Sequence, residues 1–368
     1  MIKVLVVAKD LQVQGISKVI MNYFHFLKDK DVEMDLAVGQ PIEYIYKENI
    51  EKAGRKLYAL PSKSTNSVEY YLELYKVMKM KKYNIVHVHG NSATITIELF
   101  LGLLAGIPVR IAHSHNSTCN HVIVHKTLKS IMRSLCTDRF ACSELAGRWM
   151  FGNCSFQVIQ NCFDTSIFIF DKKKRDSCRE RLQIGDAYVI GHVGFFNKQK
   201  NQKFVIEIFR EYLKKNSNSR LLLIGDGETK DNIQMYAKNL GIANKVIFFG
   251  VTNNVAELLS AMDCFVFPSL YEGLGIALIE AQINGLPCLL SDVIPDTTKI
   301  GNYYYKMSLQ NKASDWADRL MLLKRLSINR EAFYFENINT IQNYDCSKVA
   351  EKLYDIYSKA YSRTKKQN

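Results

Sequence analysis

Short apolar runs alternate with longer amphipathic stretches along most of the chain. Most runs are continuous in Val, Ile, Leu and Phe, a pattern typical of strands buried on both faces of a sheet. They predict strands in two successive series. The first series is 3–8, 33–38, 56–60, 84–89, 109–113, 139–142 and 157–159, and the second is 188–193, 220–224, 245–249, 264–267 and 287–290.

Apolar residues at helical spacing fill the intervals, for example at 16–28, 204–214, 229–240 and 348–361. Strands that alternate with helices predict parallel, doubly wound sheets, and two series predict two α/β domains. The polar run 171–181 is expected to mark the seam between them. We therefore expect an N-terminal domain over 1–168, a second over 169–345, and a closing helix over 346–368 that packs back on the first.

Ligands of open α/β sheets bind outside the carboxyl ends of the strands, so functional residues are expected in the loops that follow strands. With two sheets facing one another, the cleft between them is the expected site.

Composition narrows the class of protein. The 368 residues are 47% apolar and 23% charged, which excludes a disordered chain. No apolar run reaches the length of a spanning helix, and the N-terminus carries no signal-peptide pattern, so a cytosolic protein is expected. The nine cysteines form no C-x-x-C pair, which argues against a disulfide framework or a cysteine zinc site.

The formal net charge of +13 favours anionic partners. Nucleic-acid binding would rest on charge alone and is not expected. The stretch 126–135 places Leu128, Ile131, Met132 and Leu135 on one face with basic residues at its rim. It suits a helix at an anionic membrane surface, and equally an ordinary helix that faces the core.

Two loops carry candidate chemistry. In 265–292 a buried strand leads into Glu272, two glycines and a helix that contains Glu280, a pattern that offers backbone N–H groups and a helix N-terminus to an anion. In 190–201, IGHVGFFNKQKN, a glycine turn presents Lys198 and Lys200, and a lysine there could neutralise a leaving diphosphate. Each residue alone is more often a solvated surface group.

Six of the eight histidines lie between 87 and 125, including the H-x-H pairs at 87–89 and 113–115. No carboxylate or cysteine ligand clearly accompanies them, so a metal site is not expected. A histidine at a strand end, bonded to a substrate hydroxyl, is the favoured interpretation. The glycines of LIGDGE at 223–228 form neither a dinucleotide fingerprint nor a P-loop.

Taken in this order and spacing, these segments resemble the retaining glycosyltransferases of family 4, which have the GT-B fold of two facing Rossmann-like domains. The likeness is strongest to bacterial enzymes of capsular and exopolysaccharide assembly. Its central motif is E-x7-E, here Glu272 to Glu280 in PSLYEGLGIALIEAQINGLP. Supporting matches are 190–201, LLLIGDGE at 221–228, IAHSHNS at 111–117, ACSELAGRWMFG at 141–152 and VIQN–FD at 158–164.

The resemblance implies a metal-independent hexosyltransferase, without a cofactor, that moves a sugar from a nucleotide donor, expected to be UDP-linked, to a lipid-linked saccharide at the inner face of the cell membrane. Carried over residue by residue, it places His115 and Glu272 at the sugar, Lys200 at the diphosphate and Glu280 at the ribose. The remaining implied donor contacts are Gly15, Lys198, Gly273, Leu274 and Gly275.

Three positions depart from the family pattern. Phe195 stands where an arginine is usual, and Gln14 and Cys162 stand where glycines are usual. These departures motivate an alternative hypothesis, a non-catalytic relative that binds a nucleotide sugar or a partner enzyme. A nucleotide-sugar epimerase of similar fold is a third, weaker alternative.

Overall fold

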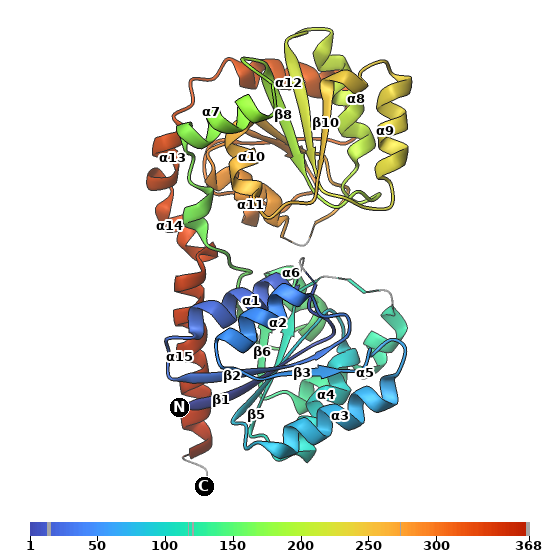
Figure 1. The fold of residues 1–368 in the computed structure, drawn as a ribbon. Helices are drawn as coiled ribbons and strands as arrows, with labels where there is room; N and C mark the ends of the chain where they lie inside the picture. The colour runs from blue at the N-terminus through green and yellow to red at the C-terminus, as the bar shows by residue number, and fades with distance from the viewer. Residues whose placement is uncertain (13–15, 117, 120, 273, 366–368) are drawn as a thin grey trace. The chain divides into compact units, whose positions relative to one another are not determined.

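The computed structural model describes residues 1–12, 16–116, 118–119, 121–272 and 274–365. The chain forms two compact units (Figure 1). Unit 1 comprises Met1–Phe163 and Asn343–Asn368, and unit 2 comprises Asp164–Gln342.

Unit 1 contains a seven-stranded sheet of order β3-β2-β1-β4-β5-β6-β7, in which all pairs are parallel. Its strands are β1 (Ile2–Ala8), β2 (Val32–Gly39), β3 (Leu57–Leu60), β4 (Ile85–Gly90), β5 (Val109–Ser114), β6 (Asp138–Ala141) and β7 (Gln157–Val158). Its helices are α1 (Ile16–Leu27), α2 (Tyr44–Lys52), α3 (Ser67–Met80), α4 (Thr96–Leu104), α5 (Val122–Leu135), α6 (Glu144–Phe151) and α15 (Cys346–Lys365).

Unit 2 contains a six-stranded parallel sheet of order β10-β9-β8-β11-β12-β13. Its strands are β8 (Tyr188–Val193), β9 (Ser219–Ile224), β10 (Val246–Gly250), β11 (Cys264–Phe267), β12 (Cys288–Ser291) and β13 (Tyr304–Met307). Its helices are α7 (Lys172–Arg181), α8 (Gln202–Leu213), α9 (Lys230–Asn239), α10 (Val255–Ala261), α11 (Ile276–Ile283), α12 (Ala313–Lys324), α13 (Arg330–Glu336) and α14 (Ile338–Ile341).

The predicted pair of parallel α/β sheets is confirmed, with two differences in detail. Strand β13 was not predicted, because Tyr304–Met307 is a half-exposed edge strand with a lysine and no continuous apolar run. The polar run expected as a seam forms helix α7 inside unit 2, where Asp171 caps its first turn and Cys178 is buried.

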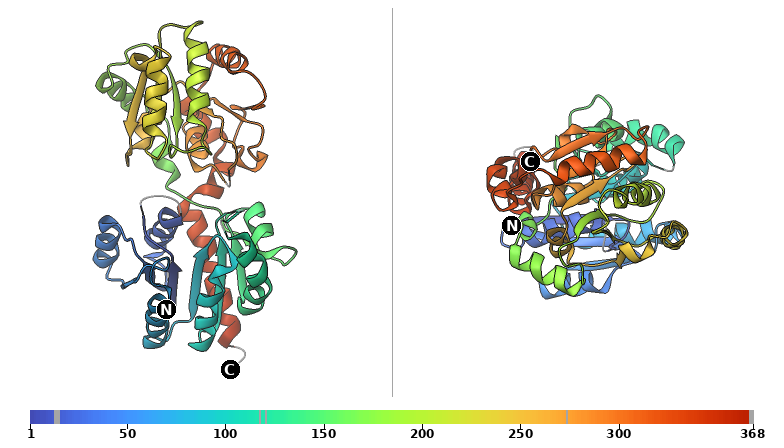
Figure 2. Two further views of the ribbon diagram at one scale, coloured as in Figure 1. Left: turned by 90° about the vertical axis from the view of Figure 1, so that its right-hand side faces the viewer. Right: turned by 90° about the horizontal axis from the view of Figure 1, so that it is seen from above.

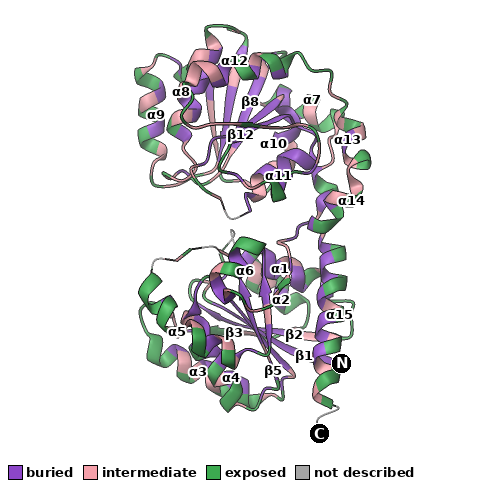
Figure 3. Ribbon diagram, turned by 180° about the vertical axis from the view of Figure 1, so that it is seen from behind, coloured by how far each residue is buried: buried purple, intermediate pink, exposed green. Residues whose placement is uncertain are grey.

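Helices cover both faces of each sheet, and the central strands between them are buried (Figures 2 and 3). In unit 1, α15 packs on α1 and on strands β1 and β5, while α4 packs against both α3 and α5. Continuous apolar strands need cover on both faces, and this requirement draws the C-terminal helix onto the N-terminal sheet. Its Tyr357 is fully buried there.

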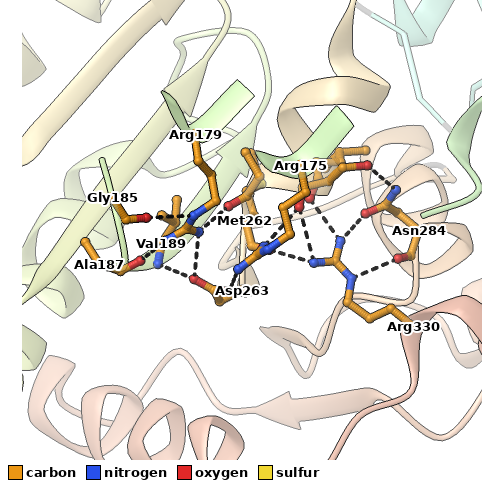
Figure 4. Close-up of polar contacts among 12 residues, drawn as sticks. Arg175, Arg179, Gly185, Ala187, Val189, Met262, Asp263, Asn284 and Arg330 are labelled. Carbon is orange, nitrogen blue, oxygen red and sulfur yellow. Dashed lines mark hydrogen bonds and ion pairs between the residues drawn. The ribbon is translucent and has the colours of Figure 1, made fainter. Parts of the chain in front are cut away.

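A cluster of arginines surrounds Asp263, at the amino end of β11 (Figure 4). The Asp263 carboxylate accepts from Arg175 at 2.5 Å, from Arg179 at 3.3 Å and from the Val189 N–H at 2.7 Å. Arg330 donates to the Met262 carbonyl at 2.7 Å and to other carbonyls at the C-terminal end of α10, and burial lowers its pKa to about 9. Cations at the end of a helix complement its exposed carbonyls. The cluster therefore ties α7, α10 and β8 together at the edge opposite the strands' carboxyl ends.

Candidate active site

The loop after β8 passes very close to the loop after β9. A Cβ at Gly225, which has φ +135°, would lie 2.1 Å from the Gly194 carbonyl oxygen. Only glycine permits this approach, which explains why the first glycine of LIGDGE stands at position 225. Phe196 N–H donates to the Asp226 carbonyl at 2.8 Å, so the two loops are also joined by a backbone hydrogen bond.

The loop after β11 leads into helix α11 through Gly275. This residue is the N-cap and adopts a left-handed conformation with φ +65°. A Cβ there would lie 3.3 Å from the ring of Phe267. The turn requires glycine, and it leaves the first amides of α11 at the carboxyl end of the sheet, where a helix N-terminus attracts negative charge.

Lys200 and Glu272 form an ion pair between these two loops. The Lys200 Nζ lies 2.7 Å from Glu272 Oε1, and the side chains are only 16% and 6% exposed. The same ammonium lies 4.9 Å from the centre of the Phe267 ring. The pair is thus a shielded charge pair at the carboxyl ends of β8 and β11, where ligands of such sheets bind.

Hydrogen bonds to backbone carbonyls join the two loops. Leu270 N–H donates to the Gln199 carbonyl at 2.8 Å, and the Gln199 side chain donates to the Tyr271 carbonyl at 2.9 Å. Asn201 donates to the Pro268 carbonyl at 3.1 Å. These contacts flank Lys200 and Glu272 on each side, so both charged groups are positioned by backbone groups.

The other predicted donor residues of unit 2 differ in how far they are buried. Lys198 is exposed on the same loop as Lys200, and Leu274 is buried. Glu280 is 5% exposed in the second turn of α11. Gly273, like Gly15 and Gln14 of unit 1, lies outside the described residues.

His192 is a residue at this site that sequence analysis did not single out. It is fully buried in β8, its Nδ1 donates to the Val266 carbonyl at 2.9 Å, and its Nε2 has no partner among the described residues. Burial, together with a smaller contribution from the charge of nearby Lys200, lowers its pKa to about 4. The sequence could have pointed to His192, because it stands two residues before Gly194, in the HVG segment that leads into the glycine turn after β8.

In unit 1, four histidines from β4 and the end of β5 form one stack. Their ring centres are 4.2 Å apart for His87 and His89 and 4.2 Å apart for His113 and His115. Burial lowers the pKa of all four imidazoles, that of His115 to about 4. Neutral rings are therefore favoured throughout the stack at neutral pH.

The four rings form two hydrogen-bonded chains. One joins the Tyr357 hydroxyl to His87 Nδ1 at 2.7 Å and His87 Nε2 to His113 Nδ1 at 3.0 Å. The other joins His89 Nδ1 to His115 Nε2 at 2.8 Å and His115 Nδ1 to Asn161 Oδ1 at 3.3 Å. One ring nitrogen from each of His87, His89 and His113 falls within 4.8 Å of the others, so these three could hold a metal ion. A metal on His87 Nε2 or His113 Nδ1 would displace the hydrogen bond that joins them.

Helix α5, the candidate membrane helix, is amphipathic, but two of its basic residues bind carbonyl groups at the end of α6. Lys129 donates to the Trp149 carbonyl at 2.6 Å, and Arg133 donates to the Phe151 carbonyl at 3.4 Å, at the end of α6. Ile123 is 81% exposed and Ile131 52% exposed. Among the described residues, no helix combines the length and apolar character required to span a bilayer.

Comparison with known proteins finds a family match within unit 2. Residues 174–335 match the family model described as "Glycosyl transferases group 1". This range contains Lys200, Glu272 and Glu280.

Two relatives extend the likeness. EpsF of Bacillus subtilis, whose glycosyltransferase assignment is itself inferred, is 28% identical over 97% of this chain and 96% of its own length. The UDP-Gal:alpha-D-GlcNAc-diphosphoundecaprenol alpha-1,3-galactosyltransferase of Escherichia coli is 27% identical over 63% of this chain and 64% of its own.

Among solved structures, Anabaena Alr3699/HepE in complex with UDP and glucose superposes with a TM-score of 0.78. It covers 98% of this chain and 100% of its own at 15% identity, so it establishes the fold alone. The shared fold is the two-domain GT-B type with two parallel sheets, and the match over 174–335 and the two relatives show that the chain is similar to glycosyltransferases.

Proposed function

We propose that this protein transfers a sugar from a UDP-sugar to a lipid-linked saccharide during assembly of a surface polysaccharide, with retention of configuration. The observation that carries the proposal is the Lys200–Glu272 ion pair beside the N-terminus of α11. The relative from Escherichia coli, whose name gives a UDP-sugar donor and an undecaprenyl diphosphate acceptor, supports these substrate classes.

The donor occupies the carboxyl ends of β8 and β11 in unit 2. Lys200 and the first amides of α11 bind the diphosphate, Glu272 accepts hydrogen bonds from sugar hydroxyls, and Glu280 binds the ribose. Without donor, Lys200 and Glu272 neutralise one another. When the diphosphate attracts the ammonium, the Glu272 carboxylate becomes available to neutral hydroxyls, so one ion pair prepares both subsites.

The transfer step depends on stabilisation of the leaving diphosphate. The bond from the anomeric carbon to the diphosphate oxygen breaks, and the charge that develops is stabilised by Lys200 and the helix N-terminus. The acceptor hydroxyl attacks from the same face, and the departing phosphate helps to take its proton. Neither a metal ion nor a second nucleophilic carboxylate is needed in this scheme.

The lipid-linked acceptor implies contact with an anionic membrane. We expect the exposed Ile123 and Ile131 of α5 to insert at the lipid interface, with Lys126 toward the headgroups. Flotation with phosphatidylglycerol vesicles tests this, with phosphatidylcholine vesicles for comparison. The double variant Ile123→Glu/Ile131→Glu should float at least fivefold less. Met235→Glu, on an exposed residue of α9, is the matched control.

A second candidate function is favoured by Phe195. This residue is 46% exposed on the donor loop, where the resembled family has arginine, so one charge toward the diphosphate is missing. The protein would then bind a nucleotide sugar without turning it over.

Release of UDP separates the two functions. The purified protein is incubated with UDP-, GDP- and ADP-sugars in the presence of lipid-linked acceptors, and nucleotide release and product are measured. Transfer from a UDP-sugar, with the anomeric configuration of the donor retained in the product, supports the enzyme. Binding of a UDP-sugar without release under all these conditions supports the non-catalytic function.

A further inference from the structure

Two cysteines that lie far apart in sequence meet in the interior of unit 1. The Sγ atoms of Cys162 and Cys346 are 2.7 Å apart, although 184 positions separate the two residues in the chain. Cys162 is 2% exposed and Cys346 is fully buried. No sequence pattern could reveal this pair, because its members stand on either side of the whole of unit 2.

Cys162 is also one of the three departures from the pattern of the resembled family, in which a glycine is usual at this position. The proposed donor site makes no use of it. Its neighbour Cys346 is the first residue of α15, the helix that packs on α1 and on the N-terminal sheet. The departure therefore places a thiol against the start of this helix.

Backbone contacts hold the two segments together. The Phe163 N–H donates to the Tyr344 carbonyl at 3.0 Å, and the Cys346 N–H donates to the Phe163 carbonyl at 3.1 Å. From α1, the Asn22 side chain donates to the Cys162 carbonyl at 2.6 Å. The two thiols are thus brought together by hydrogen-bonded backbone, and a disulfide requires little movement of either segment. Its S–S length is about 2.05 Å, so the two sulfurs need to approach by less than about 1 Å.

A second buried pair provides a comparison. Cys264 and Cys288 are fully buried on the neighbouring strands β11 and β12 of unit 2. Their thiols are directed to backbone carbonyls, that of Cys264 to Pro287 at 3.2 Å and that of Cys288 to Leu286 at 3.3 Å. Burial is therefore common to both pairs, whereas the close approach of the sulfurs distinguishes Cys162 and Cys346.

We propose that Cys162 and Cys346 form a site of oxidative modification, at which a peroxide joins the two thiols into a disulfide. Hydrogen peroxide oxidises one sulfur to a sulfenic acid and is itself reduced to water. The other thiol attacks this sulfur, the S–O bond breaks, and the hydroxyl leaves with the thiol proton as a second water. Two thiols and one hydrogen peroxide thus give one disulfide and two waters. Burial restricts the oxidant to a molecule as small as peroxide.

The disulfide fastens α15 to the loop after β7. Since unit 2 lies between the two cysteines in the chain, α15 docks on the N-terminal sheet only after a long intervening segment. A bond between the two ends of that segment restricts the unfolded chain and lowers its conformational entropy. Oxidation is therefore expected to stabilise unit 1 against unfolding.

Peptide mapping of the full chain tests the proposal. The protein is treated with hydrogen peroxide, unfolded in the presence of an alkylating reagent and digested without reduction. A linked peptide pair that contains Cys162 and Cys346 should be the main disulfide product, and dithiothreitol should remove it. Peptides linked through Cys264 and Cys288 should be at least tenfold less abundant.

Thermal unfolding measures the effect on stability. The oxidised wild type should unfold with a midpoint at least about 4 °C above that of the same sample after reduction. This comparison needs no variant, so it holds even where a cysteine variant folds poorly. Cys162→Ser and Cys346→Ser should each abolish the shift, and Cys288→Ser is the matched control that should retain it.

Absence of the Cys162–Cys346 product, both in the folded protein and after refolding from urea in the presence of peroxide, would overturn the proposal. Equal amounts of the Cys264–Cys288 product would do the same, because proximity would then not select the pair. An unchanged midpoint with the disulfide formed would overturn the fastening of α15. These measurements need neither donor nor acceptor, so their outcome is independent of the proposed function.

Discussion

The Lys200 ammonium lies 2.7 Å from the Glu272 carboxylate, although 71 residues separate the two in sequence. Both groups are largely shielded from water, and each is held by a loop whose backbone is bonded to the other loop. Charges kept in this way are already positioned before a donor arrives. The arrangement predicts that the two residues act on adjacent parts of one donor molecule, Lys200 on the diphosphate and Glu272 on the sugar bonded to it.

Removal of Lys200 should lower the rate of UDP release at least hundredfold. The reason is the loss of a fixed positive charge beside the departing diphosphate, an effect typically worth about 10²–10³ in rate. Steady-state release of UDP from Lys200→Ala measures it. Lys203→Ala, at an exposed lysine of α8, is the control and should stay within twofold of the wild type. Comparable losses in both variants would contradict a specific role for Lys200.

The substitution Glu272→Gln should lower release of UDP through the sugar subsite. A glutamine retains the size of the side chain but loses a charge-assisted hydrogen bond to a hydroxyl, worth roughly 1.5–3 kcal/mol, or about ten- to hundredfold. The binding of free UDP should change much less than the binding of the UDP-sugar. A larger effect on UDP than on the UDP-sugar would place Glu272 at the nucleotide instead.

Restoration of an arginine at position 195 should raise activity. Phe195 is exposed on the donor loop, so Phe195→Arg can be accommodated there and adds a charge toward the diphosphate. We expect a gain of about tenfold in turnover for an enzyme with low basal activity. No turnover in either protein, with UDP-sugar bound by both, would favour the non-catalytic function.

A methyl group at Gly225 should destabilise the donor loops. Its Cβ would lie 2.1 Å from the Gly194 carbonyl oxygen at a backbone angle that favours glycine, a cost of roughly 2–5 kcal/mol. The control is Gly241→Ala, where φ is +73° and nothing lies within 4 Å, which should cost only about 1 kcal/mol. Urea unfolding of both variants provides the comparison, and equal costs would contradict the close approach of the loops.

Loss of the carboxylate charge at Asp263 should lower the free energy of unfolding more than loss of a surface carboxylate does. Asp263→Asn leaves Arg175 and Arg179 without their charged partner, a change that costs about 3–5 kcal/mol for shielded pairs (Figure 4). Glu211→Gln, in an exposed pair with Lys214, should cost less than about 1 kcal/mol. Thermal and urea unfolding measure the difference. A cost below about 1 kcal/mol for Asp263→Asn would show that carbonyl groups alone satisfy the arginines.

Stability should fall as pH falls from about 6.5 toward 4. Burial lowers the pKa of His192 to about 4 in the folded chain, below the usual value of about 6.5 in an unfolded one. In that interval the unfolded chain binds a proton that the folded chain does not, which costs up to about 1.4 kcal/mol per pH unit. Urea unfolding between pH 7 and 5 measures the slope. The slope of His192→Gln should be smaller by about that amount, and an unchanged slope would contradict a neutral His192.

Much of the fold could be predicted because its strands are continuous apolar runs, a pattern typical of strands buried on both faces of a sheet. Strand β13 could not, since Tyr304–Met307 pairs along one edge only and half-exposes its aromatic residues. The helix at Lys172–Arg181 could not be predicted either, for a related reason. Its charged residues give no apolar stripe, and its stability comes from tertiary bonds of Arg175 and Arg179.

The loops of the candidate site could be predicted from the glycines and from the rule that parallel strands end at one edge. Their contacts could not. That Lys200 pairs with Glu272 depends on the hydrogen bonds between the loops at Gln199 and Leu270, which carry no sequence pattern. The histidine-rich region could be located, but its two hydrogen-bonded chains depend on Tyr357 and Asn161, which lie far away in sequence.

Calorimetric titration of UDP into the wild type and Lys200→Ala tests the donor site most directly, because it requires neither the right sugar nor the right acceptor. The account predicts that UDP binds the wild type at micromolar to low millimolar concentration, that Lys200→Ala binds it at least tenfold more weakly, and that Lys203→Ala binds it as the wild type does. Equal affinity of the wild type and Lys200→Ala for UDP would contradict the assignment of this loop to the diphosphate.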